Sequence, residues 1–184
     1  MRRVAVRLVF ALLMLPALGG CHRSRYPEGR DPTVRERLPK KFPIDVLEQA
    51  DRLEVLALDE PDRFTGRLAT NPNVSVRAAV DVESPAQRER LIRTLYRSIH
   101  DATLMALCFH PHHAIRARRG ADTIEIVVCF SCLQIAVPDG EGGYPTVAIR
   151  PGDLLDLFDG IFERQRRLRF DRAKDNFGSW VPMD

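Results

Sequence analysis

The chain has 184 residues, of which 45% are hydrophobic and 29% charged, a composition that fits one globular domain and excludes a disordered protein. Its formal net charge of +3 comes from the N-terminus, because Arg2, Arg3 and Arg7 precede Cys21 and no acidic residue does. The remaining side chains are balanced in charge, so the composition gives no evidence for a nucleic acid as partner.

The first 20 residues have the layout of a secretory signal, with a basic start, an apolar run from Leu8 to Leu15, and small residues before Cys21. This run is shorter than the roughly 20 residues that a membrane-spanning helix needs. The segment Leu18-Gly19-Gly20-Cys21 resembles the lipobox of bacterial lipoprotein precursors. The resemblance implies cleavage before Cys21, acylation of its thiol, and a lipid anchor in the bacterial cell envelope. His22, where an Asp would favour the inner membrane, implies the outer membrane facing the periplasm.

Residues 21–41 are expected to form the lipidated cysteine and a flexible tether, because prolines and charged residues dominate the segment. Its seven basic and three acidic side chains suit either a solvated spacer or attraction to anionic lipid headgroups. We expect residues 42–184 to form a single domain.

The first half of this domain is predicted to contain two strands and a helix. Alternating apolar residues indicate strands at 53–57 and 74–82. A helix is expected from Pro85, because Ser84 can cap it and apolar residues then recur at helical spacing. The members of this apolar face are Leu91, Ile92, Leu95, Ile99 and Ala102.

The second half is predicted to contain a hairpin, further strands and a final helix. Residues 114–118 and 123–128 alternate around Gly120, and 133–137 can continue the second of these strands. A strand near 146–150 precedes a helix that Asp153 can cap. Short connections between the late strands favour an α+β fold, with a small antiparallel sheet packed against two main helices.

Cysteine and histidine residues gather in two short segments, Cys108-Phe109-His110-Pro111-His112-His113 and Cys129-Phe130-Ser131-Cys132. The pair resembles C-F-x-P-x-H and C-F-x-C segments of uncharacterised bacterial proteins, a resemblance that implies no activity. If Gly120-Ala121 is a two-residue turn, Ile115 faces Ile126 and His112 faces Cys129, and Cys132 lies beside Cys108. A turn at Arg119-Gly120 would place His110 opposite Cys129 instead.

The cluster allows three chemistries. Cys108, His112, Cys129 and Cys132 have the right number and type of donors for a Zn²⁺ site, with His110 as a second histidine candidate. Joint ligation by Cys129 and Cys132 requires a turn at Phe130-Ser131, since positions three apart point to opposite faces of a strand. A disulfide suits an oxidising compartment, and we expect it between Cys108 and Cys132. Thiol exchange is the third chemistry; a redox C-x-x-C usually opens a helix, whereas a strand follows Cys132 here.

The sequence therefore predicts a membrane-anchored envelope lipoprotein whose domain is a non-enzymatic binding or structural module, with an envelope protein as a possible partner. The alternative is a zinc-binding or thiol-redox protein that uses the cysteine cluster. Zn²⁺ is the one cofactor that these residues suggest, and nucleic acid is not expected as a partner outside the cytoplasm. No nucleophile–base pair or carboxylate dyad is evident, so no catalytic residue is predicted. His113, on the apolar row of its strand, is expected to be part-buried with its hydrogen bonds satisfied.

Overall fold

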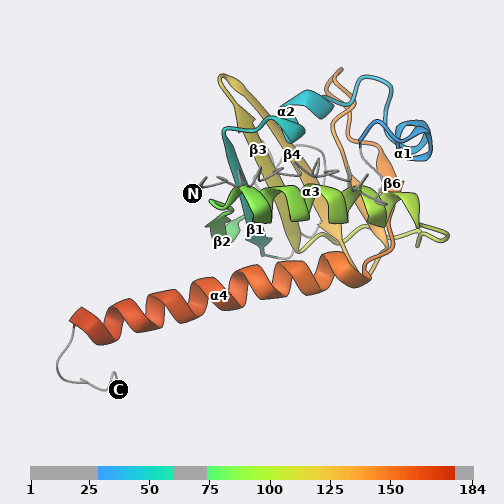
Figure 1. Cartoon of the computed structure of the whole chain (residues 1–184). Coiled ribbons are helices and arrows are strands. Elements are labelled where there is room, and N and C mark those ends of the chain that lie inside the picture. The colour runs from blue at the N-terminus through green and yellow to red at the C-terminus, as the bar shows by residue number, and fades with distance from the viewer. Residues whose placement is uncertain (1–28, 60–73, 177–184) are drawn as a thin grey trace, which may run out of the picture.

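The computed structural model describes residues 29–59 and 74–176, with side chains as far as Arg166. The signal segment, Cys21 and the first part of the predicted tether lie outside these ranges. The helices are α1 (Pro32–Arg37), α2 (Ile44–Glu48), α3 (Pro85–His100) and α4 (Gly152–Asn176). The strands are β1 (Arg52–Leu58), β2 (Val76–Asp81), β3 (His113–Arg119), β4 (Asp122–Cys129), β5 (Gln134–Ala136) and β6 (Thr146–Ala148) (Figure 1).

The six strands form one sheet in the order β2-β1-β3-β4-β5-β6, and every neighbouring pair is antiparallel. This confirms the predicted α+β class, with α3 and α4 as its two long helices. The β3–β4 hairpin pairs Ile115 with Ile126 and His113 with Val128, which is the register predicted for a turn at Gly120-Ala121 and not that of a turn at Arg119-Gly120. Gly120 takes φ +56 in this turn, a conformation that favours glycine.

The helices cover one face of the sheet. Figure 1 shows α3 lying across the strands and α4 beside it, with the C-terminal half of α4 extending beyond the sheet. The core between these layers contains Leu91, Leu95 and Ile99 from α3, Phe158 from α4, and the inward-facing residues of the strands. None of the helices in the described part of the chain is long and apolar enough to cross a membrane.

Both long helices begin near the predicted positions, but their caps differ from the expectation. Ser84 is the N-cap of α3, yet its side chain makes no capping hydrogen bond. Helix α4 starts at Gly152, so Asp153 lies inside its first turn rather than capping it. The Asp153 carboxylate instead forms an ion pair with Arg97 of α3, with Nη1 and Oδ2 3.0 Å apart. This contact joins the two long helices.

The predicted tether boundary at residue 41 is wrong, because the folded domain already includes α1. Asp31 caps this helix by accepting hydrogen bonds from the backbone N–H groups of Thr33 and Val34. Val34 and Leu38 are buried in the core, and Arg37 donates to the carbonyls at the end of α3. Prolines and charged residues dominate the segment, so its composition did not indicate that Val34 and Leu38 would be buried.

Candidate functional site

The two-cysteine segment forms the turn between β4 and β5, not a continuation of β4 as the sequence suggested. Cys129 is the last residue of β4 and pairs with Gln134, the first residue of β5. Between them the chain reverses, and Leu133 takes φ 57, which is unfavourable for a residue with a side chain. The side chains of Cys129 and Cys132 can meet only if the chain turns at Phe130-Ser131, and the structure contains this turn.

This turn brings Cys129 and Cys132 into a disulfide, with their Cα atoms 5.2 Å apart. The expected pairing of Cys108 with Cys132 is thus wrong, because the expectation left Cys132 within a strand. The predicted proximity of Cys108 and Cys132 is confirmed, however. The Sγ atoms of Cys108 and Cys132 lie 3.6 Å apart, and Cys108 is a free, exposed thiol. Cys129 and Cys132 are both fully buried.

The loop that carries Cys108 joins α3 to β3 and is held against the disulfide turn. The Ala106 N–H donates to the carbonyl of Cys132 at 3.0 Å, and the His110 N–H donates to Cys132 Sγ at 3.3 Å. The buried side-chain amide of Gln134 donates to the carbonyls of Ala106 and Cys108. Gln134 was not among the predicted site residues, although a lone polar residue in the apolar run 133–137 was a usable signal. These bonds fix Cys108 beside Cys132.

The expected zinc ligands do not form a metal-binding group in this structure. Within residues 29–59 and 74–166, no cluster of three or more His, Cys, Asp or Glu side chains is arranged to hold a metal ion. Two of the four predicted donors, Cys129 and Cys132, are joined to each other. His110 and His112 are exposed, and His110 meets the cluster through its backbone N–H.

His113 lies on the helix-covered face, part-buried as expected. Its ring packs against Phe130, Phe158 and Phe162 at centroid distances of 5.2, 5.5 and 6.1 Å. Its Nδ1 atom is buried and has no hydrogen-bond partner in the described part of the chain, so the expectation of satisfied hydrogen bonds is wrong. Burial lowers the pKa of His113, and the neighbouring His112 lowers it further.

A row of charged side chains crosses the opposite face of the sheet. Glu54, Arg116 and Glu125 face one another on β1, β3 and β4. Both carboxylates are buried, and Arg116 Nε donates to Glu125 Oε1 at 2.9 Å. Glu54 Oε2 lies 3.5 Å from Arg118 Nη2, an ion-pair distance, but accepts no hydrogen bond from any residue that the structure describes. The confirmed hairpin register pairs Arg116 with Glu125, so half of this row was predictable from the sequence.

At the outer end of the row, Arg52 binds Asp81 of β2 with Nε and Oδ1 2.6 Å apart. The hydrogen bond from Arg52 holds the pKa of the Asp81 carboxyl below its usual value. The same guanidinium also lies 3.2 Å from Glu54 Oε1. Arg52 therefore connects an exposed ion pair to the buried carboxylate.

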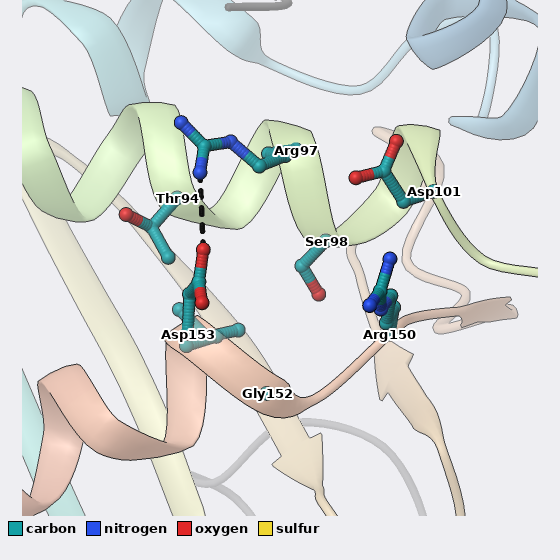
Figure 2. A pocket seen from close by; sticks show the side chains of 8 residues that line it. Thr94, Arg97, Ser98, Asp101, Arg150, Gly152 and Asp153 are labelled. Carbon is teal, nitrogen blue, oxygen red and sulfur yellow. Dashed lines mark hydrogen bonds and ion pairs between the residues drawn. The ribbon is translucent and has the colours of Figure 1, made fainter.

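A polar pocket of about 220 Å³ lies between the end of α3 and the start of α4 (Figure 2). Figure 2 shows Asp153 directed at Arg97, with Ser98 next to this pair and Arg150 at the other end of the pocket, near Asp101. Ser98 is buried, and its Oγ has no hydrogen-bond partner in the described residues. The backbone connects this pocket to the disulfide turn, because Arg150 N–H donates to Ser98 O at 2.8 Å and Ile149 N–H donates to Leu133 O at 2.9 Å.

No protein-family model matches the chain, and neither a curated protein nor a solved structure is significantly similar to it.

Proposed function

We propose that this chain is a lipid-anchored lipoprotein of the bacterial envelope, held on the outer membrane with its domain facing the periplasm. The support is the order of the N-terminal features: a basic start, an apolar run, and the segment Leu18-Gly19-Gly20-Cys21. Acyl chains on Cys21 would contribute about 0.8 kcal/mol per buried CH₂, sufficient for anchoring without a spanning helix. The membrane is then the primary partner, an envelope protein is a second, and nucleic acid is excluded by location.

The domain has two candidate roles, as a binding or structural module and as a thiol–disulfide module. The disulfide suits the first role because it closes the β4–β5 turn. A structural disulfide does not require a free thiol at its side. The exposed Cys108 thiol, 3.6 Å from Cys132 Sγ, is the observation that favours the second role. We therefore propose that the domain exchanges thiols and disulfides at the membrane surface.

Zinc binding remains the competing chemistry of the same cluster. It needs thiolates, and the disulfide leaves Cys108 as the one free thiol of the three domain cysteines. Any Zn²⁺ site that uses Cys108, His112, Cys129 and Cys132 therefore belongs to the reduced protein.

The anchor is tested by expressing the full chain in a Gram-negative host with an alkyne analogue of palmitate. Wild type should carry the label and sediment with the outer membrane, whereas Cys21→Ser should carry no label. Cys108→Ser is the matched control and should be labelled like wild type. Label retained in Cys21→Ser would overturn the assignment of Cys21.

The thiol function is tested on the full-length protein in detergent, by its rate of reaction with an aromatic disulfide reagent and by its metal content. We expect one rapidly reacting thiol, lost in Cys108→Ser, and no stoichiometric zinc in the oxidised protein. A thiol no more reactive than one in an unfolded peptide would reduce the cluster to a structural role. Stoichiometric zinc, lost in Cys129→Ser, would instead establish the metal site.

A further inference from the structure

Resting on the thiol–disulfide function proposed above, we infer that the three domain cysteines form a relay that carries a disulfide from the protein interior to its surface. Cys108 is the attacking thiol, Cys132 the sulfur attacked, and Cys129 the leaving group. The product is a Cys108–Cys132 disulfide, and its ligand class is a cysteine-bearing peptide.

The positions of the three sulfurs support this order of attack. Thiol–disulfide exchange requires the attacking sulfur to reach one sulfur of the disulfide, and Cys108 Sγ lies 3.6 Å from Cys132 Sγ. Cys108 is exposed, whereas Cys129 and Cys132 are fully buried. An external thiol therefore reaches Cys108 more readily than the Cys129–Cys132 disulfide.

The surroundings of Cys129 suit a leaving thiolate. The backbone N–H of Cys132 donates to Cys129 Sγ at 3.2 Å, and the hydroxyl of Ser131 lies 3.5 Å from the same sulfur. Hydrogen bonds to sulfur favour its ionised form and so lower the cost of breaking its bond. Because these groups belong to the turn itself, Cys129 remains in place to attack again.

The internal step needs no outside oxidant. The Cys108 thiolate attacks Sγ of Cys132, a Cys108–Cys132 bond forms, and the Cys129–Cys132 bond breaks. The electron pair of the broken bond leaves on Cys129, which takes up a proton equal to the one Cys108 released. One disulfide and one thiol are present before and after, so the step is an isomerisation.

Two external steps then oxidise the substrate. A substrate thiolate attacks Cys108 Sγ, forms a mixed disulfide with Cys108 and releases Cys132 as a thiol. A second substrate thiolate attacks the substrate sulfur of this mixed disulfide and releases Cys108. The net result is one substrate disulfide formed and one protein disulfide reduced by two electrons.

The surface around Cys108 indicates the substrate class. Leu104, Met105 and Leu107 are 71%, 55% and 105% exposed, and they lie in the same loop as the Cys108 thiol. Single exposed apolar side chains are ordinary, but three of them within four consecutive residues form a local apolar surface of the kind that marks interaction sites. A peptide with apolar residues beside its cysteine can cover Leu104, Met105 and Leu107 while its thiol reaches Cys108.

Disulfide mapping tests the internal step on the full-length protein in detergent. Trypsin cleaves after Arg116, Arg118 and Arg119, so a Cys108–Cys132 bond links two peptides while a Cys129–Cys132 bond lies within one. We expect Cys129→Ser to contain the Cys108–Cys132 bond and Cys108→Ser to contain the Cys129–Cys132 bond. Two free thiols in folded Cys129→Ser would overturn the relay.

The external steps are tested with a reduced peptide that has one cysteine flanked by leucines, and with cysteamine as a small hydrophilic thiol. Cys108→Ser, which keeps the native disulfide, should be reduced by the peptide about tenfold more slowly than wild type or worse. Leu107→Ala should slow the reaction with the peptide but not with cysteamine. Equal rates for Cys108→Ser and wild type would overturn the relay.

The two proposals fail differently. If Cys108 reacts rapidly with the disulfide reagent while the Cys129→Ser protein keeps two free thiols, the relay is wrong and the thiol function stands. If Cys108 is unreactive, both proposals fall together.

Discussion

The two faces of the sheet use the same strands for different purposes. The helix-covered face is apolar from β1 to β6 and packs against α3 and α4. The opposite face carries a charged row of Glu54, Arg116 and Glu125, then a short apolar row around Leu56 and Val127. The disulfide and Cys108 lie at the end of the same strands. Side-chain alternation thus separates groups that stabilise the domain from groups that can act chemically.

Substitutions on the two faces should therefore destabilise the domain in different ways. On the helix-covered face a substitution removes contacts and leaves a cavity. On the opposite face it leaves a charge or a thiol without its partner. These substitutions should also differ in the size of their effect on stability, from Phe158 with the largest effect to His113 with the smallest.

Phe158→Ala should have the largest effect, because Phe158 is fully buried between α4 and the sheet. Truncation of a buried aromatic ring costs about 3–5 kcal/mol in the free energy of unfolding. Urea denaturation should show a lower midpoint with an unchanged m-value. A loss below about 1 kcal/mol would mean that α4 does not cover the core in solution.

Arg116→Met should cost about 3 kcal/mol of unfolding free energy, because it removes the cation that hydrogen-bonds the buried Glu125 carboxylate and lies 4.0 Å from the buried Glu54 carboxylate. The exposed Arg119→Met is the matched control and should change stability by about 0.5 kcal/mol or less. Adding Glu54→Gln and Glu125→Gln should restore part of the loss. If the triple variant were no more stable than Arg116→Met, charge burial would not explain the effect.

Cys132→Ser should cost about 2 kcal/mol of unfolding free energy, because the disulfide closes a short loop with a sequence separation of 3. It also removes the sulfur common to both disulfides of the relay. Cys108→Ser, which keeps the native disulfide, should remain within about 0.5 kcal/mol of wild type. Equal losses in the two variants would contradict the assigned pairing.

The smallest effect concerns the pH dependence of stability, which His113 should contribute from the helix-covered face. Its pKa is lowered on folding by burial, so the unfolded chain binds a proton more readily than the folded domain. Its contribution is complete above the unfolded pKa of about 6.5 and is lost as the pH falls below that value.

His113→Phe tests this contribution, since a phenyl ring suits the surrounding Phe130, Phe158 and Phe162 and cannot be protonated. Denaturation curves at pH 7 and pH 5 should differ less for the variant than for wild type. A steeper pH dependence in the variant would show that His113 is charged in the folded domain.

Local signals in the sequence determined much of this fold. The hairpin was predicted from Gly120 with two registers open, and the structure has the one with the turn at Gly120-Ala121. Helix α3 followed from its apolar spacing. Helix α1 was missed, because its burial depends on distant residues and not on its own composition. The disulfide partner was missed for a related reason. Whether Cys132 lies in a strand or in a turn depends on the unusual positive φ of Leu133, which no residue type in the segment indicates.

The hydrogen bond from Ala106 N–H to the carbonyl of Cys132 makes the state of the disulfide turn observable from a distance. Any rearrangement of that turn which lengthens this bond exposes the Ala106 amide to solvent deuterium. Its hydrogen-exchange rate is then a reporter that requires neither an attached probe nor a mutation. The same bond links the loop to the turn: a protein bound to the exposed Leu104, Met105 and Leu107 would slow exchange at Ala106 and stabilise the turn.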